Sequence, residues 1–226
     1  MNNKTSVISR QNLVPFVLIT CCFALWGFAN DITNPMVAAF GTVLEISNFK
    51  AALVQLAFYG GYFTMALPAA LFIRRYSYKS GILIGLGLYA VGALLFYPAA
   101  AMEKFTFFLM ALYIMTFGLA FLETTANPFI LSLGDKSTAT RRLNLAQSFN
   151  PLGSILGMIV ASRFILAALE SDQLDFSKLN EADKALVRTN DLLVIRDPYV
   201  LLGLVVLIFL VVIASAKIPK GADRTA

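Results

Sequence analysis

The sequence predicts an all-α membrane protein of six transmembrane helices, and its composition, hydropathy and charge placement each support that class. Apolar residues make up 58% of the 226 residues and charged residues only 14%, with a mean hydropathy of +0.75. A soluble domain of this length needs far more polar surface. The net charge of +5 is carried by short segments between apolar stretches, which argues against a nucleic-acid partner.

Each predicted helix is an apolar stretch long enough to cross a bilayer, whose hydrocarbon core requires about 20 residues per helix. The predicted spans are residues 14–40, 51–73, 81–100, 105–133, 143–169 and 198–216. Together they form one domain, residues 1–226, embedded in the lipid bilayer. The connecting segments are short except for residues 170–197, where Asn180 followed by Asp183 indicates the start of a surface helix.

The placement of lysine and arginine predicts that both termini lie in the cytoplasm. In this orientation the cytoplasmic side holds eleven basic residues: Lys4, Arg10, Arg74, Arg75, Lys79, Lys136, Arg141, Arg142, Lys217, Lys220 and Arg224. The opposite side holds six: Lys50, Lys104, Lys178, Lys184, Arg188 and Arg196. Cytoplasmic loops of membrane proteins carry the excess of such residues, so the bias indicates the orientation.

The first and fourth spans share a short pattern that indicates an internal repeat. Asp31 is followed by Asn34-Pro35, and Glu123 is followed by Asn127-Pro128. These spans are the corresponding helices of two three-helix repeats, and helices interrupted at corresponding places in inverted repeats point to a transporter's binding site. Chance similarity between two short strings is the alternative.

Two carboxylates, those of Asp31 and Glu123, lie within predicted spans. Inserting a charged side chain at the centre of a helix costs on the order of 3 kcal/mol, so such residues almost always face the bundle interior or a water-filled cavity. The sequence contains no histidine, which leaves these two carboxylates as the natural proton carriers of a coupled transporter. A structural role, hydrogen-bonded to neighbouring helices, is the alternative for each.

Amide side chains recur in the fifth span, where Asn144, Gln147 and Asn150 are three residues apart and are predicted to form a polar stripe on one helix face. Amides and carboxylates together supply the donors and acceptors that a sugar requires. Aromatic residues of the first two spans are candidates for stacking on a sugar ring or, as is commoner, for packing: Trp26, Phe58, Tyr59 and Tyr62.

Other features predict packing and exclude several classes of function. Gly153 and Gly157 form a small-xxx-small pattern that favours close helix packing. Cys21 and Cys22 are neighbours, which suits neither a disulfide framework nor a metal site, so we expect both to pack. The sequence shows no nucleophile–base set and no phosphate loop, so we expect no enzyme, no metal and no cofactor, with protons as the coupling ion.

Several long strings in this sequence resemble the N-terminal half of the fucose:proton symporter family of the major facilitator superfamily. They are LWGFAN, NFKAALVQLAFYGGYF, RRYSYKSGI, LETTANPF and RRLNLAQSFN, in the same order and at the same spacing as in the family. The resemblance covers nearly the whole chain. It implies one half of a major facilitator fold, built as a 3+3 inverted repeat. It also implies proton-coupled uptake of L-fucose or a related hexose across a bacterial inner membrane.

The resemblance also implies roles for individual residues. Glu123 matches the family's buried glutamate, while Gln147 and Asn150 match its amides. In the first span the family's N-N-x-N-D is replaced by residues 30–34, NDITN, so that an acid and an amide have exchanged places. The predicted proton-coupling residues are Asp31 and Glu123. The predicted substrate-binding residues are Trp26, Asn30, Asn34, Tyr59, Asn127, Gln147 and Asn150.

The family has twelve spans and binds sugar between two six-helix halves, whereas this sequence has six. The resemblance therefore implies that transport requires a second six-helix bundle, supplied by a separate chain or by a second copy in a homodimer. The alternative is a truncated or non-transporting membrane protein that retains a sugar-binding face.

Overall fold

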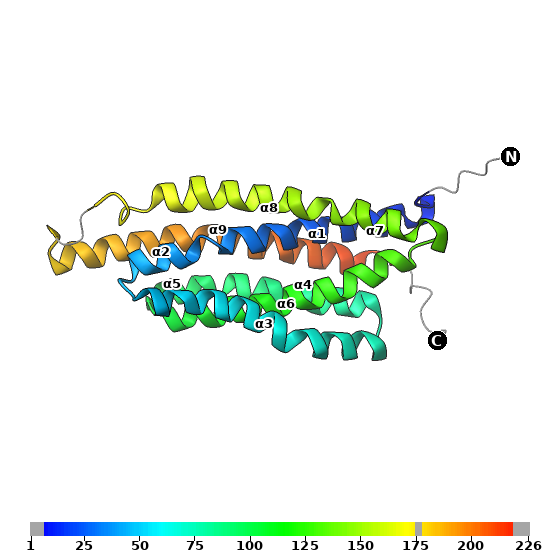
Figure 1. Ribbon diagram of the computed structural model, residues 1–226, viewed down its shortest axis with the longest axis horizontal. Coiled ribbons are helices and arrows are strands. Elements are labelled where there is room, and N and C mark those ends of the chain that lie inside the picture. The colour runs from blue at the N-terminus through cyan, green and yellow to red at the C-terminus, as the bar shows by residue number, and fades with distance from the viewer. Residues whose placement is uncertain (1–6, 175–177, 219–226) are drawn as a thin grey trace.

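The computed structural model describes residues 7–174 and 178–218, which leaves the predicted cytoplasmic residues Lys4, Lys220 and Arg224 outside the described part. In the described residues, six helices are long and apolar enough to span a membrane, and no strand occurs. The predicted all-α class with six spans is confirmed. The helices run along one common axis, and the start of α1 and the end of α9 lie at the same end of the bundle (Figure 1).

Three of the six spans, the first, third and fifth, consist of more than one helical segment. The first is α1 (Leu13–Thr33) and α2 (Met36–Val43), after a 3-10 turn at Arg10–Asn12; the second is α3 (Asn48–Arg75); the third is α4 (Tyr78–Leu94) and α5 (Phe96–Met102); the fourth is α6 (Phe105–Ser132). The fifth comprises a 3-10 turn (Lys136–Thr138), α7 (Ala139–Gln147), α8 (Phe149–Val160), a π-helical turn (Ala161–Ile165) and a 3-10 turn (Leu166–Ala168), and the sixth is α9 (Glu181–Ser215).

The start of the sixth span differs from the prediction. We expected a surface helix from Asn180 and a separate span from residue 198, but α9 is one helix of 35 residues that continues through Pro198. The Asn180 side chain caps it, accepting a hydrogen bond from the Asp183 backbone N–H at 2.8 Å. The predicted cap is therefore correct, and the helix that it starts extends far beyond the surface segment.

The N-terminal part of α9 continues as a helix because it binds the loops at that end of the bundle. Arg188 donates to the Glu45 carboxylate at 3.0 Å, and the Thr189 hydroxyl donates to the Glu103 carboxylate at 2.6 Å. Glu45 and Glu103 both have left-handed backbone conformations, with φ of 48° and 51°, in the loops after α2 and α5. Both loops are thus attached to the same helix.

The loop that precedes α9 is attached to it as well. Asp191 is fully buried, and its two carboxylate oxygens accept backbone N–H groups of Glu170 at 2.8 Å and Ser171 at 3.0 Å. A buried carboxylate is stable only when its oxygens are paired in this way. All three loops at this end of the bundle therefore contact one continuous helix.

Glycines bring helix backbones into direct contact. A Cβ added to Gly153 would lie 1.9 Å from the Ala24 carbonyl oxygen, and one added to Gly157 would lie 2.5 Å from that of Phe28, so α8 packs on α1 with no room for side chains. The packing role predicted for this glycine pair is confirmed. On the other side of the bundle, α4 and α6 are equally close at Gly118, where a Cβ would lie 2.3 Å from the Tyr89 backbone nitrogen.

Arg142, in α7, is completely buried and caps the C-terminal end of α6. Its guanidinium donates to the carbonyl oxygens of Ile130 at 3.2 Å, Leu131 at 2.9 Å and Asp135 at 3.1 Å, and to the Thr138 hydroxyl at 2.7 Å. Carbonyls in the last turn of a helix lack intrahelical partners, and Arg142 supplies donors to them. The sequence analysis counted this residue only as part of the charge bias.

Replacing Arg142 with alanine should destabilise the bundle, because it leaves buried carbonyls without donors. We expect a loss of about 3 kcal/mol, which corresponds to a few charge-assisted hydrogen bonds. Denaturation in detergent micelles, followed by far-ultraviolet circular dichroism, measures the change. Arg141→Ala is the matched control, since Arg141 is exposed; equal stability of the two variants would contradict this role for Arg142.

Candidate functional site

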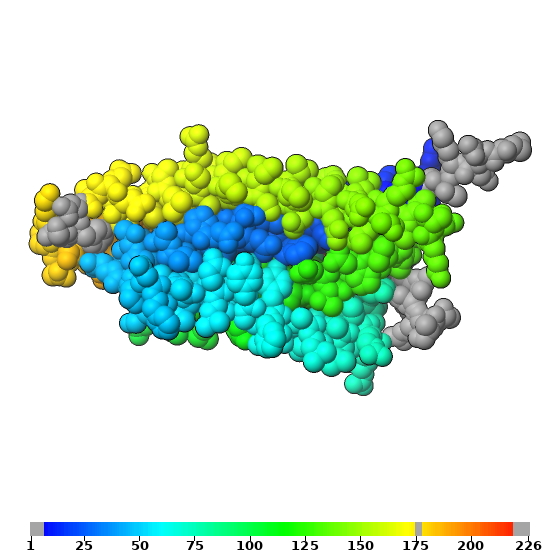
Figure 2. Space-filling model, in the orientation of Figure 1, coloured from blue at the N-terminus to red at the C-terminus, as the bar shows by residue number. Residues whose placement is uncertain are grey.

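The predicted site residues come from four spans that lie together across one face of the bundle. Figure 2 shows α1 running across the middle of this face, flanked by α8 on one side and by α3 on the other, with α6 next to α1. Trp26, Asn30 and Asp31 belong to α1, Tyr59 to α3, Glu123 and Asn127 to α6, and Gln147 and Asn150 to the fifth span.

Two hydrogen-bonded side-chain networks occupy this face. The first, the Trp26 network, consists of Trp26, Tyr62 and Asn30. The indole Nε1 of Trp26 donates to the Tyr62 hydroxyl at 2.5 Å, and the Tyr62 hydroxyl donates to Asn30 Oδ1 at 3.4 Å. This network joins α3 to α1 through polar atoms of half-buried side chains.

The second, the Gln147 network, consists of Gln147, Asn127 and Glu123. Gln147 Nε2 donates to Asn127 Oδ1 at 2.9 Å, and Asn127 Nδ2 donates to the Glu123 backbone carbonyl at 3.0 Å. The Glu123 side chain is half-exposed, and its carboxylate interacts electrostatically with the Tyr62 hydroxyl. Glu123 therefore interacts with both networks, through its backbone carbonyl with Asn127 and electrostatically with Tyr62.

Asp31 and Asn34 form a separate pair. Asn34 Nδ2 donates to Asp31 Oδ1 at 3.1 Å, at the point where Pro35 separates α1 from α2. Asn34 also lines a cavity of about 600 Å³ beside α2 and the start of α3. Neither Glu123 nor Gln147 lines that cavity, so the structure does not join the two predicted proton carriers in one network.

The two Asn-Pro motifs of the predicted repeat have different effects on their helices. Pro35 interrupts the first span, whereas α6 continues through Pro128 to Ser132. The expectation of two helices interrupted at corresponding places is therefore wrong for α6. Side chains provide a reason: Asn127 bonds within its own helix and to Gln147 of the neighbouring span, which holds α6 regular around its proline.

The residues of the predicted amide stripe contact different helices. Because α7 ends at Gln147 and α8 begins at Phe149, Gln147 bonds to α6, whereas Asn150 Nδ2 donates to the Phe23 carbonyl of α1 at 3.3 Å. Asn144 remains exposed. Asn150 thus lies at the contact between α1 and α8, where its backbone oxygen would be 2.1 Å from a Cβ at Gly27.

Tyr59 and Tyr62 differ from the expectation for the aromatic residues. Tyr59 is 62% exposed and contacts the Phe58 ring edge-on, without joining either network. Tyr62 is the residue whose importance sequence reasoning missed. It was considered only for stacking or packing, because no local pattern indicates that its hydroxyl reaches Trp26 and Asn30 on another helix.

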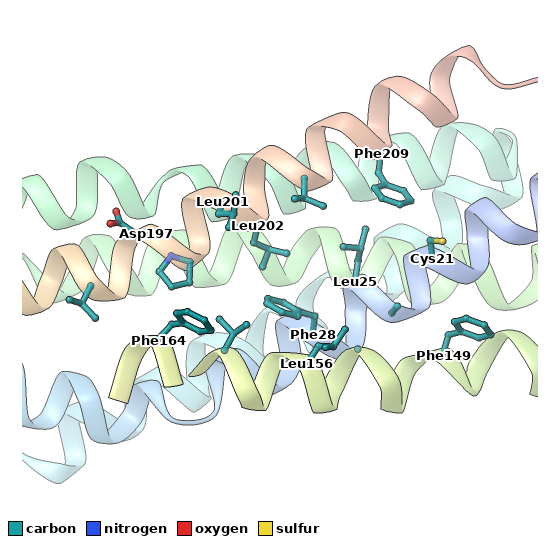
Figure 3. A pocket seen from close by; sticks show the side chains of 16 residues that line it. Cys21, Leu25, Phe28, Phe149, Leu156, Phe164, Asp197, Leu201, Leu202 and Phe209 are labelled. Carbon is teal, nitrogen blue, oxygen red and sulfur yellow. The ribbon is translucent and has the colours of Figure 1, made fainter. Parts of the chain in front are cut away.

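A larger groove, of about 860 Å³, lies elsewhere, between α1, α8 and α9 (Figure 3). Leu25, Phe28, Leu156 and Phe209 line it with other apolar side chains, and Asp197 is its one charged lining residue. None of the predicted site residues lines this groove, although Leu25 and Phe28 are close to Trp26 in the sequence. Its apolar lining does not suit a polyhydroxy ligand. Among the described residues, no three acidic or cysteine side chains gather as metal ligands do.

Comparisons with known proteins agree with this geometry. Residues 19–222 match the Major Facilitator Superfamily. The L-fucose-proton symporter of Haemophilus influenzae is 65% identical over 225 residues, which cover 97% of this chain and 52% of the relative. A glucose/galactose transporter of Brucella abortus is 33% identical over 93% of this chain and 48% of its own length.

The fold is likewise found in a solved transporter. The crystal structure of FucP in the outward conformation superposes with a TM-score of 0.81 at 37% identity, covering 94% of this chain and 51% of FucP. The chain therefore spans about half the length of the relatives that it matches. With six spans, a polar face carried by four of them, and a family match over most of its residues, this chain belongs to the major facilitator superfamily and has the fold of one half of such a transporter.

Proposed function

We propose that this chain is one six-helix half of a proton-coupled sugar symporter whose substrate is L-fucose or a related hexose. The observation that carries the proposal is the polar face that combines the Trp26 network, the Gln147 network and the Glu123 carboxylate. Such a face offers amide and carboxylate groups to a neutral polyol, in helices that are otherwise apolar. The 65% identity to a protein named L-fucose-proton symporter supports the choice of sugar and of coupling ion.

Glu123 is the proposed proton carrier, with Asp31 as the second. A charged carboxylate is costly in a cavity closed to water, and a proton removes that charge. Binding of a proton and a neutral sugar therefore lets the cavity close without an unpaired anion. No cofactor other than the proton is needed for this step.

The sugar would contact the polar groups of both networks. Asn30, Asn127 and Gln147 supply hydrogen-bonding groups, and the Trp26 ring supplies a surface for the C–H face of a sugar. Asn34, Asn150 and Tyr59 are proposed to contribute from the edges of this face. For Asn150 the contribution would be through helix packing as well as through its amide.

The partner is a second six-helix bundle, either a separate chain or a second copy. Large apolar side chains face outward from the two helices that border the polar face, among them Phe63 (86% exposed) and Leu67 (68%) on α3, and Ile155 (55%) and Leu156 (57%) on α8. The bilayer and the second bundle would cover them. The proposed location is a bacterial inner membrane with both termini in the cytoplasm, which the lysine and arginine bias supports.

Reconstitution tests the proposal directly. The chain should be co-expressed with the remaining half of the Haemophilus influenzae symporter and placed in proteoliposomes, where we expect an inward proton gradient to drive L-fucose uptake. The chain alone should give no uptake, because alternating access requires two bundles that move against each other. Uptake by a monomer of this chain would contradict the half-transporter proposal, and no binding or uptake by the pair would favour a non-transporting protein.

Replacing Glu123 with glutamine should uncouple sugar movement from the proton. Glutamine keeps the size and a polar group but cannot release a proton, so proton-driven uptake by the pair should fall at least tenfold while sugar exchange across the membrane persists. Radiolabelled fucose measures both. Glu181→Gln, which changes a side chain that is 91% exposed at the start of α9, is the control. Unchanged proton-driven uptake in Glu123→Gln would remove this residue from the proton path.

Asp31 and Asn34 hold an acid and an amide in the reverse order to the family pattern. Variants that restore the family order test whether the two positions are interchangeable. Asp31→Asn should lower proton-driven uptake, because asparagine can still accept from Asn34 but cannot bind and release a proton. The double variant Asp31→Asn, Asn34→Asp restores an acid–amide pair, shifted along the axis by about 4.5 Å, and should recover part of the uptake. A double variant that behaves like Asp31→Asn alone would show that the positions are not interchangeable.

A further inference from the structure

The Trp26 network has a direction that its chemistry imposes. An indole N–H can only donate, so the Tyr62 hydroxyl must accept from Trp26 Nε1, at 2.5 Å. The single proton of that hydroxyl is then available for Asn30, whose nearest atom to it is Oδ1 at 3.4 Å. This second contact is longer than the first.

The direction of the network determines which group Asn30 offers to a ligand. Because its carbonyl oxygen accepts from Tyr62, its NH₂ group is directed away from Tyr62, and it makes no hydrogen bond with any described residue. Among the described residues, the Gln147 network leaves a hydrogen-bond acceptor free for a ligand, whereas the Trp26 network leaves a donor free. Asn127 uses its NH₂ group on the Glu123 carbonyl, so its oxygen accepts from Gln147 Nε2, which leaves the Gln147 carbonyl oxygen as an acceptor.

We propose that Tyr62 is a positioning residue of the sugar site: its hydroxyl orients the Asn30 amide so that Asn30 donates to a sugar hydroxyl, while Gln147 accepts from another. This inference rests on the proposed function and extends it to a residue outside the predicted set. It also defines the ligand as a neutral polyol with one hydroxyl that accepts and one that donates. An anionic sugar is disfavoured, because the Glu123 carboxylate belongs to the same polar face and would repel it.

The packing around Tyr62 makes it suitable for this role. Gly61 contacts α6 so closely that a Cβ there would lie 1.8 Å from the Thr116 hydroxyl oxygen, and Gly27 contacts α8 in the same manner. These two glycines adjoin Tyr62 and Trp26 in the sequence. The backbone beside each ring system is therefore closely packed on a neighbouring helix, α8 for Trp26 and α6 for Tyr62.

The test uses the fact that Trp26 is the one tryptophan of this chain. Tyr62→Phe removes only the hydroxyl, so the fluorescence emission maximum of Trp26 in the purified chain should shift when its N–H loses this acceptor. In the reconstituted pair, the KM for L-fucose exchange should rise about tenfold with little change in the maximal rate, as expected for the loss of one hydrogen bond made to bound sugar.

Tyr113→Phe is the matched control. The Tyr113 hydroxyl also joins α3 to another helix, through Thr64 Oγ1 at 3.1 Å, but it belongs to neither network. It should leave both the emission and the KM unchanged. Asn30→Asp keeps an oxygen for Tyr62 and removes the NH₂ donor, so it should raise the KM while the Trp26 emission stays as in the wild type.

The double variant Tyr62→Phe, Asn30→Asp decides whether the two residues act as a unit. Its KM should be no higher than that of Asn30→Asp alone, because Tyr62 acts through the amide that is already lost. Wild-type emission and KM in Tyr62→Phe, a shifted emission with wild-type KM, or full additivity in the double variant would each overturn the inference. If the reconstituted pair exchanges no fucose at all, the proposed function is contradicted. The comparison of Trp26 emission between the wild type and Tyr62→Phe still decides whether the Tyr62 hydroxyl bonds to Trp26.

Discussion

The arrangement of the polar face depends on contact between helix backbones at glycines. In a bilayer the lipid tails are as apolar as leucine, so helices associate through close van der Waals packing and not through hydrophobic burial. Gly27 and Gly153 fix α1 on α8, and Gly61 fixes α3 on α6, each with no space for a Cβ. Trp26 precedes Gly27 and Tyr62 follows Gly61 in the sequence, so each side chain of the hydrogen bond extends from a closely packed backbone.

The two repeats share a motif but use it differently. In the first repeat Pro35 ends α1, and the acid and amide before it pair with each other. In the second, Pro128 lies within α6, and Asn127 bonds to its own helix and to Gln147. One motif therefore yields an isolated ion–amide pair in one helix and a network between two helices in the other. This asymmetry separates the two carboxylates that the sequence treats as equivalent.

Hydropathy and charge were sufficient to predict the class, the number of spans and the close packing at Gly153 and Gly157, because these depend on local composition. The start of α9 was not predictable from hydropathy, since its first residues are polar and are held by Arg188 and Asp191 contacts with other loops. Contacts between distant segments also limited the prediction of the site. Glu123, Asn127 and Gln147 could be found from a motif, whereas the bond between Tyr62 and Trp26 joins residues 36 positions apart on different helices, and no local pattern encodes it.

The attachment of three loops to one helix has a mechanical consequence. Since Glu45, Glu103 and the backbone after the fifth span all bind the first turns of α9, no hairpin at this end can tilt without moving the others. The part of α9 from Glu181 to Asp197 extends for about 25 Å, so one continuous helical segment bears all three loop contacts. The three attachments therefore couple the loops at this end of the bundle to one another through α9.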